Sequence, residues 1–281
     1  MAPPGPYSAR VRRALAQQRR IAAGFSSAGF PADPPRFIGG ADIAFAPAAG
    51  PGTPVRAGAV GSVGLAVAVV YDLLARRIVE CRYARRRVGF PYVPGLLSFR
   101  EEPILRAAIR RIRTPVDVWL FDGHGRAHPR GAGLATHMGV RLGLVSIGVA
   151  KALLVGAVAR SGPHTHRRAA GPPVRGAPVR HRGVAVAEAL WTQPAEDPIY
   201  VSCGHRVTLD QAVATVLACL GGHRLPEPTH TADALGRAVR HLPARAARRY
   251  VEAAAGQADR LSPAEKAPRL THNLSARLYN D

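Results

Sequence analysis

The hydrophobic residues of the chain fall into short runs that predict strands alternating with helices. Residues 9–24 repeat apolar positions at helical spacing between arginines, so Val11, Leu15 and Ile21 are expected to face a core. Three later runs have the apolar pattern of strands, at residues 37–45, 61–72 and 76–86. Because short connections join these strands, they predict an antiparallel meander.

The middle of the chain has a different pattern, in which strands alternate with helices. An amphipathic helix is expected over residues 98–113, followed by an apolar strand over 116–122 that ends in an aspartate. A helix near 133–142 and a buried strand at 145–150 come next. Continuous apolar strands flanked by helices indicate parallel neighbours that are covered on both faces.

The last elements complete a mixed sheet. Strands are expected near residues 184–191 and 198–202, followed by a helix near 207–221 and a further helix that starts in RLPEPTHTADAL. The predicted fold class is therefore α/β, with three antiparallel strands, then parallel strands, and helices packed on both faces of the sheet.

Three stretches lack the pattern of a packed core. The Pro-rich residues 1–8 are expected to be disordered, and residues 160–183 are expected to form a basic flexible loop without periodicity. Residues 242–281 are Ala/Arg-rich, partly helical, and are interpreted as a basic tail. One folded domain over residues 9–241 is therefore expected.

The charge balance points to a polyanionic partner. The 281 residues include 39 Lys and Arg against 18 Asp and Glu, a formal net charge of +21, and such a protein meets nucleic acid in a cell. Hydrophobic residues make up 47% of the chain, which excludes a wholly disordered protein. The longest apolar run, residues 57–71, is too short to span a bilayer, and the N-terminus lacks the apolar core of a signal, so a cytoplasmic protein without membrane contact is expected.

Three acidic residues stand in positions that a purely structural role does not favour. Asp42 lies inside an apolar strand, Asp122 closes another, and Glu101 lies near a helix start. Each also has a structural interpretation: an edge strand facing water, a turn before Gly123, and a capping box with Ser98. Together, two strand aspartates and a helix glutamate are the oxygen ligands that a phosphodiesterase using Mg²⁺ or Mn²⁺ needs.

Two other residues could take part in that chemistry. Lys151 is one of only two lysines in an arginine-rich chain, and it follows a buried strand. It could contact a phosphate or lie on the surface. Tyr92 stands between two prolines in GFPYVPG, where its ring could wedge between bases or pack on its own prolines.

Histidines occur in two groups, which receive different interpretations. His124 and His128 lie beside Asp122 in the glycine-rich stretch DGHGRAHPR, which favours a role at the same site. The pair His164 and His166 falls in the basic loop over 160–183, as does His181, and these three are interpreted as bystanders. The three cysteines are far apart and lack CxxC spacing, which argues against a cysteine zinc cluster or a disulfide framework.

Six motifs resemble, in order, those of the endonuclease V family: FIGGADIAF, FPYVPGLLSFRE, FDGHGRAHPR, SIGVAK, GHRVTLD and RLPEPTHTAD. The resemblance covers roughly residues 9–240, and several of the motifs are long and contiguous. It implies a ribonuclease-H-like fold and a nuclease directed at deoxyinosine. The loop over 160–183 and the tail over 242–281 look longer or more basic than is usual for the family, which bears on affinity and salt dependence rather than on the chemistry.

The resemblance also implies a catalytic set of five residues. Asp42 and Asp122 match two metal-binding aspartates, and Glu101 matches a catalytic glutamate. Asp233 in PEPTHTAD matches a fourth position, where the family carries His or Asp, and it also suits the first turn of a helix. Glu101 and Asp233 would complete the acidic site directly or through bound water. Lys151 in IGVAK matches a lysine placed near the scissile phosphate.

Two groups of residues match the family's means of recognising a lesion. The wedge that enters the duplex matches Pro91, Tyr92, Val93 and Pro94. The pocket that receives the flipped base matches Gly95, Leu97, Gly123, His128 and Gly133.

The function that the resemblance implies is DNA repair with Mg²⁺, or with Mn²⁺ in its place. A monomer would bind double- or single-stranded DNA containing deoxyinosine and hydrolyse the second phosphodiester bond 3′ to the lesion, leaving 3′-hydroxyl and 5′-phosphate ends. Two alternatives stay open, an inosine-specific endoribonuclease on the same scaffold and a non-catalytic basic nucleic-acid-binding protein. A ribose next to the lesion tests the first, and metal-dependent cutting tests the second.

Overall fold

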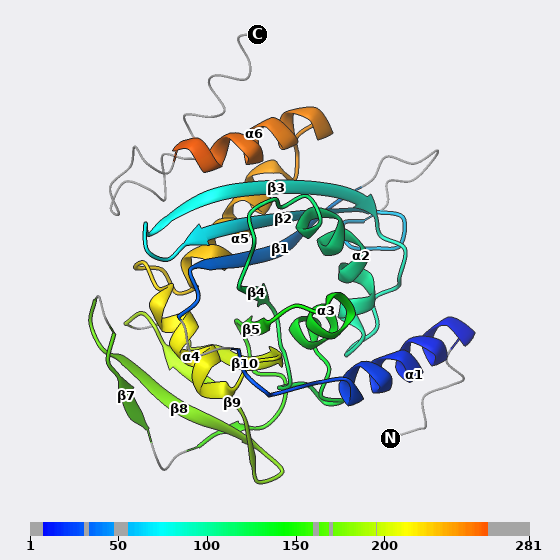
Figure 1. The fold of residues 1–281 in the computed structure, drawn as a ribbon. Coiled ribbons are helices and arrows are strands. Elements are labelled where there is room, and N and C mark those ends of the chain that lie inside the picture. The colour runs from blue at the N-terminus through cyan, green and yellow to red at the C-terminus, as the bar shows by residue number, and fades with distance from the viewer. Residues whose placement is uncertain are drawn as a thin grey trace.

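One ten-stranded sheet runs through the part of the chain that the computed structural model describes, residues 8–30, 34–47, 56–159, 163–168, 171–194 and 196–257 (Figure 1). Its strands are β1 (Phe37–Ala46), β2 (Val63–Asp72), β3 (Arg77–Arg87), β4 (Val118–Asp122), β5 (Ser146–Ala150), β6 (Ala157–Val158), β7 (His164–His166), β8 (Val174–His181), β9 (Val184–Trp191) and β10 (Ile199–His205). The helices are α1 (Ala9–Ala23), α2 (Leu97–Ile109), α3 (Leu134–Leu142), α4 (Leu209–Ala218), α5 (Glu227–Val239) and α6 (Ala244–Gln257).

The order of the strands confirms the predicted mixed sheet. It runs β3-β2-β1-β4-β5-β10-β9-β8-β6, with β7 paired to β8 outside this path. Strands β1, β2 and β3 form the antiparallel meander, and β4 is parallel to both β1 and β5. The later strands β10, β9 and β8 are antiparallel to their neighbours. This meander followed by parallel strands gives the ribonuclease-H-like fold.

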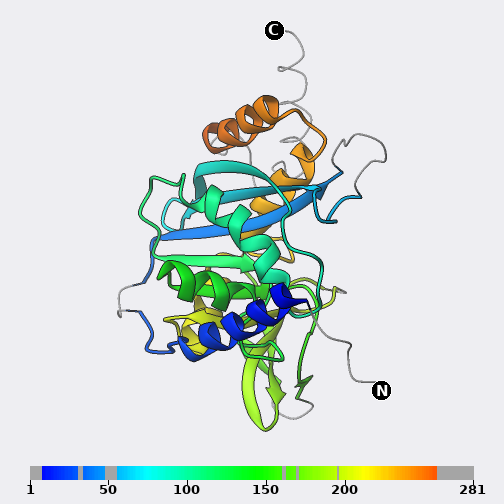
Figure 2. The same cartoon turned by 90° about the vertical axis from the view of Figure 1, so that its right-hand side faces the viewer.

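Helices cover both faces of the sheet, as the continuous apolar strands predict. On one face, α5 packs on β1 and β2, α4 on β10, and α6 on β3, and together they enclose the larger core cluster. On the other face, α2 and α3 pack over Ala66, Trp119 and other residues of a second cluster. Figure 2 shows α1 lying alongside α3, outside the layer that contacts the sheet. Both core layers therefore hold the central strands β1 and β4 rigidly in place.

Two stretches differ from their predicted structure. The basic segment 160–183 contains β7 and the whole of β8, and β8 pairs with β9 from Arg175 to His181. Helix α6, in the basic tail, packs on β3 and buries Ala247, Tyr250 and Val251 in the larger core cluster. The predicted disorder of residues 1–8 falls almost wholly outside the described residues.

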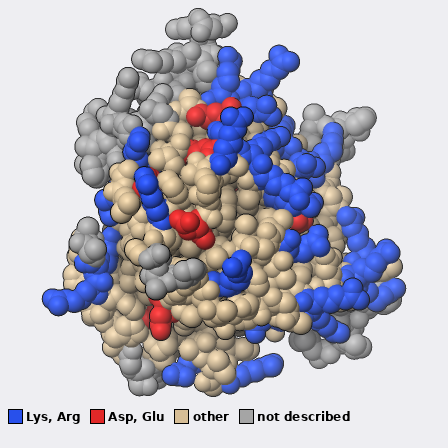
Figure 3. Space-filling view, in the orientation of Figure 1, with Lys and Arg blue, Asp and Glu red and all other residues tan. Residues whose placement is uncertain are grey.

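Arginine side chains crowd parts of the surface. Figure 3 shows them dense over the upper right of this face, near α6 and the adjoining end of β3. One hollow in this area is lined by five arginines: Arg85, Arg111, Arg245, Arg248 and Arg249. Among the described residues, no helix is long and apolar enough to cross a membrane. These arginines place positive charge on a surface that a polyanion could contact.

Candidate active site

Strand register brings Asp42 and Asp122 together. In the parallel ladder of β1 and β4, Ala41 pairs with Phe121, so the two aspartates occupy the next position on adjacent strands. Side chains alternate across a strand, and Ile38 and Leu120 both lie in the core cluster under α5. Asp42 and Asp122 therefore point to the α5 face. Strand β1 has partners on both sides, so the interpretation of Asp42 as an edge residue facing water is wrong.

Helix α5 adds a third carboxylate to this pair. Gly40 of β1 faces α5, where any Cβ would collide with the backbone of Pro228, so only glycine lets the helix come this close. Asp233, further along α5, then reaches the strand ends. One carboxylate oxygen from each of Asp42, Asp122 and Asp233 lies within 4.8 Å of the others. The structure thus brings three of the predicted acids into one cluster.

Crowding and burial make Asp42 and Asp122 hard to ionise in the metal-free protein. Burial, together with the charges of Asp122 and Asp233, raises the pKa of Asp42 to about 7. Burial also raises the pKa of Asp122, although the neighbouring Lys151 counteracts part of this effect. Each charge costs free energy because it leaves water and meets others of the same sign. A divalent cation between the oxygens would remove both penalties.

Glu101 lies beside this cluster but outside its ligand triangle. Its side chain projects from α2 on the other face of the sheet and is buried. Burial, followed by the charges of Asp42 and Asp122, raises the pKa of Glu101 to about 8. The capping interpretation is wrong, because α2 starts at Leu97 and has no side-chain cap, and the Ser98 hydroxyl has no hydrogen-bond partner. Glu101 is free of that structural role.

Lys151 supplies positive charge to the carboxylates. It follows β5, next to β4 in the sheet, and its Nζ lies 2.5 Å from Asp122 Oδ2 and 3.6 Å from Asp233 Oδ2. Burial works against its charge, but Asp122 and Asp233 raise the pKa of Lys151 above the ordinary value. Arg237, one turn along α5, pairs with Asp233 at 2.8 Å. Lys151 is therefore part of this cluster rather than an isolated surface lysine.

A cavity of about 460 Å³ opens beside the acids. It is lined by Asp42, Glu101 and Asp122 together with eight of the nine residues matched to the wedge and base pocket: Tyr92, Val93, Pro94, Gly95, Leu97, Gly123, His128 and Gly133. Pro91 is absent from this lining, and His124 belongs to it. Burial, with the nearby Arg130, lowers the pKa of His128 to about 4, so this imidazole is neutral at physiological pH.

Residues 89–95, the Tyr92 loop, are held by hydrogen bonds at Gly95, and the tip of the loop is exposed. The Tyr92 side chain is 68% exposed, so most of its ring faces solvent, and the Arg100 guanidinium lies 5.8 Å from its ring centroid. Gly95 ends the loop with φ +76°, a conformation that other residues rarely adopt. The backbone oxygen of Gly95 accepts hydrogen bonds from Gln18 and Arg130.

Gln18 and Arg130 were missed from the sequence. Gln18 is fully buried, and its amide nitrogen donates to Gly95 O at 2.8 Å and to Ala132 O at 2.9 Å, which ties the Tyr92 loop to the glycine-rich loop. A signal existed, since the buried positions of α1 are Val11, Ala14, Gln18 and Ile21, a helical stripe with one polar member. Leu15 lies only partly buried beside this stripe.

The donor set of the cluster fits a hard divalent cation. Carboxylate oxygens are the ligands that Mg²⁺ and Mn²⁺ prefer, and Mg²⁺ in proteins commonly uses one to a few carboxylates plus water. Asp42, Asp122 and Asp233 offer three such oxygens, and Glu101 lines the same cavity as Asp42 and Asp122. The fold and this cluster therefore define a ribonuclease-H-like protein with a carboxylate cluster at the ends of its central strands that could hold a metal ion.

Comparison with known proteins gives the family. The family model for endonuclease V matches residues 25–234, and the chain belongs to this family of nucleases. Endonuclease V of Roseiflexus sp. (strain RS-1) is 46% identical over 183 residues, which cover 64% of this chain and 78% of the relative. Endonuclease V of Trichormus variabilis is 35% identical over 232 residues, 83% of this chain and 96% of the relative.

Solved structures agree with this assignment. Endonuclease V of Streptomyces avermitilis has a TM-score of 0.65 and 36% identity, and the match covers 84% of this chain and 94% of that one. Endonuclease V of Ciona intestinalis, solved with a 24-mer DNA containing an inosine followed by a ribo-adenosine, has a TM-score of 0.64 at 22% identity, covering 81% of this chain and 96% of that one. The second likeness shows the shared fold.

Proposed function

We propose that this protein is a Mg²⁺-dependent endonuclease that recognises deoxyinosine in DNA and hydrolyses the second phosphodiester bond 3′ to it. The observation that carries the proposal is the junction of two features. The carboxylate cluster, which suits a cation, opens directly into a cavity with an exposed aromatic loop at its rim. Family membership supports the same chemistry.

The metal role falls to the clustered aspartates. Asp42, Asp122 and Asp233 would hold the cation, and Mn²⁺ could replace Mg²⁺ there. When bound, such a cation polarises a phosphate and favours attack by water. The remaining steps are assigned to the protein's own side chains.

Two side chains would act on charge and protons around the scissile phosphate. Lys151 carries a flexible ammonium at the edge of the cluster, where it can stabilise negative charge that develops on phosphate oxygens. Glu101 has a pKa near 8 without metal, close to neutral pH, which suits a group that exchanges protons with water. Products with 3′-hydroxyl and 5′-phosphate ends are expected.

The cavity suits a base that has left the duplex. Its volume falls in the range of small-molecule sites, and glycines along its wall expose backbone groups without side chains in the way. Hypoxanthine pairs poorly with thymine, so it costs less to flip than a normal base. Residues 91–94, with Tyr92 at their centre, would fill the space that the flipped base leaves.

The test is nicking of end-labelled duplexes with and without one deoxyinosine. Wild-type protein is assayed in Mg²⁺, in Mn²⁺ and in EDTA, and the cut is mapped to the nucleotide. Asp122→Asn keeps the shape of the side chain but removes a charge, and Asp197→Asn is the control because Asp197 is exposed. We expect a Mg²⁺-dependent nick at the proposed bond, lost in Asp122→Asn and kept in Asp197→Asn.

Three results would count against the proposal. Equal cutting in EDTA would remove the metal role, and full activity of Asp122→Asn would remove the assigned ligand. Cutting that ignores the lesion would remove the specificity. A parallel substrate with one ribose 3′ to the lesion tests the endoribonuclease alternative, since a requirement for the 2′-hydroxyl would move the assignment to RNA.

A further inference from the structure

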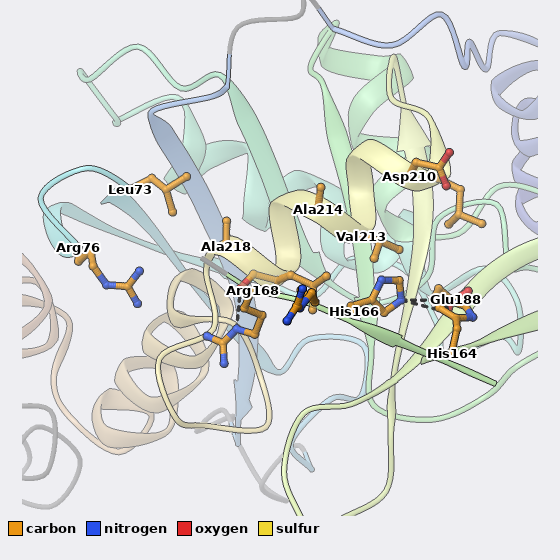
Figure 4. Close-up of a pocket in the computed structure, with 13 residues that line it drawn as sticks. Leu73, Arg76, His164, His166, Arg168, Glu188, Asp210, Val213, Ala214 and Ala218 are labelled. Carbon is orange, nitrogen blue, oxygen red and sulfur yellow. Dashed lines mark hydrogen bonds and ion pairs between the residues drawn. The ribbon is translucent and has the colours of Figure 1, made fainter. Parts of the chain in front are cut away.

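A second group of metal-ligating side chains lies at the other end of the sheet. His164 and His166 project from β7, and Glu188 projects from β9 (Figure 4). The strand ladders pair His164 with Gly176 of β8 and Gly176 with Leu190 of β9, which puts all three side chains on the face toward α4. Neither the nuclease chemistry nor the lesion pocket uses them.

The three side chains converge on one point. His164 Nε2 lies 2.9 Å from Glu188 Oε1 and 3.0 Å from His166 Nε2, and His166 Nε2 lies 3.4 Å from the same oxygen. Zn²⁺ binds imidazole nitrogen and carboxylate oxygen at about 2.0–2.2 Å in tetrahedral sites, which puts neighbouring ligand atoms roughly 3.3–3.5 Å apart. The observed triangle has nearly that size.

Protons alone satisfy this triangle poorly. A neutral imidazole carries one N–H. If both Nε2 atoms carry hydrogen, two N–H groups face each other at 3.0 Å. If only one does, the other Nε2 has a lone pair directed toward the carboxylate oxygen. A cation at the centre accepts all three lone pairs at once.

The backbone leaves room for that arrangement. A Cβ on Gly176 would lie 2.5 Å from His166 Nε2 and 2.6 Å from Glu188 Oε1, so a side chain there would occupy the place where the ligand atoms meet. The side chain of Glu188 is only 7% exposed, and a buried carboxylate needs a compensating charge. Glycine on β8 and a buried acid on β9 are two independent features of a built site.

We propose that His164, His166 and Glu188 bind a Zn²⁺ ion that fastens β7 to the sheet. Neutral imidazoles with one carboxylate are a ligand set that Zn²⁺ favours. The remaining coordination position faces a cavity of about 680 Å³ beneath α4, where water completes the tetrahedron. Arg168, just after β7, donates to the carbonyl oxygens of Leu217 and Leu220, so the ion and this arginine hold the basic segment at two points.

The test measures Zn²⁺ binding to the full chain after treatment with a chelator and exchange into Mg²⁺, which occupies the carboxylate cluster. We expect one tight equivalent by calorimetry, and Co²⁺ in its place should give the intense visible bands of tetrahedral coordination. His166→Ala and Gly176→Ala, the second with all three ligands intact, should each weaken binding by about 100-fold or more. His181→Ala, at the far end of β8, is the matched control and should bind as wild type.

Several outcomes would overturn the site. Unchanged Zn²⁺ affinity in His166→Ala would place the ion elsewhere, and weak octahedral Co²⁺ bands would contradict the ligand geometry. Absence of a tight equivalent in the wild type would leave a proton-linked His–Glu network instead. Circular dichroism of each variant checks folding, and Glu188→Gln repeats the test if Gly176→Ala disturbs the strand. Mg²⁺-dependent nicking is assayed separately, so failure of the nuclease assignment does not affect this result.

Discussion

The two groups of converging ligands on this sheet differ in donor chemistry and in support. Asp42, Asp122 and Asp233 offer only oxygen and carry several negative charges, so they suit a hard cation that keeps its water and meets a phosphate. His164, His166 and Glu188 offer two nitrogens and one charge, a set for Zn²⁺. One sheet therefore carries two groups of ligands that favour different kinds of cation.

The strands that carry the two groups of ligands also differ in how firmly the fold holds them. Asp42 and Asp122 stand on central strands with neighbours on both sides, and core layers cover both faces. His164 and His166 stand on a three-residue strand that pairs only with β8 among the described residues. A site for chemistry needs the first kind of support, because small displacements of reacting groups are costly. A site on a short strand is better suited to holding that strand in place.

Removing Lys151 should give the largest difference in behaviour between the two groups of ligands. Lys151→Ala should lower the single-turnover nicking rate at saturating Mg²⁺ by about 10²-fold, since one positioned group that stabilises developing charge is worth roughly this much. The affinity of His164, His166 and Glu188, the histidine cluster, for Zn²⁺ should stay unchanged. Arg237→Ala is the control, because Arg237 also pairs with Asp233 but is 60% exposed and should matter less. An unchanged rate in Lys151→Ala would remove its role at the phosphate.

The carboxylate site could be predicted from sequence because its residues lie in strands and motifs with clear local signals. Asp42 interrupts an apolar strand and Asp122 ends another. The register of these two parallel strands then places the aspartates side by side. The distances and the pKa of Glu101 could not be predicted, because they depend on how deeply α2 packs. The helix also starts at Leu97, one residue before Ser98, which removes the capping alternative that the sequence favoured.

The histidine cluster was missed for a physical reason. Strand β8 contains Gly176 and Pro178, residues that weaken or exclude most strand assignments. Without β8, there was no reason to bring β7 beside Glu188 of β9, and the pair His164 and His166 was dismissed as part of a loop. Helix α6 shows a similar effect, since its buried positions are hidden in an Ala/Arg-rich composition.

The pH dependence of folding stability tests whether the acidic residues at the carboxylate end of the sheet are buried and crowded. Asp42 and Glu101 have pKa values of about 7 and 8 in the folded metal-free protein, above their ordinary values near 4. The folded state then holds more protons than the unfolded state, so stability falls as pH rises toward 8. His128, His137 and His230, whose pKa values burial lowers, oppose this trend near pH 6.5, where the unfolded chain still holds part of their protons. Above about pH 7.5 they are neutral in both states and add little.

We therefore expect the free energy of unfolding in EDTA to fall by about 1–2 kcal/mol between roughly pH 7.5 and 8.5. Denaturant titrations at several pH values measure it. Glu101→Gln should flatten the slope, and saturating Mg²⁺ should stabilise the protein more at pH 8 than at pH 6.5, because deprotonated ligands bind the ion. A flat profile in wild-type protein would mean that these carboxylates are not buried and crowded as described.

The exposed ring of Tyr92 gives the smallest effect of the three, and it tests whether the carboxylate end of the sheet is also the recognition end. Tyr92→Ala should lower discrimination between deoxyinosine and undamaged duplexes by about tenfold, since stacking of one base on an aromatic side chain is worth roughly 1–3 kcal/mol. Leu74→Ala is the matched control, because Leu74 is 77% exposed in the turn between β2 and β3. The ratio of kcat/KM for the two duplexes measures discrimination, and binding to undamaged DNA should change little. Equal losses on both duplexes would show that Tyr92 adds affinity for any DNA and does not act as a wedge beside the lesion.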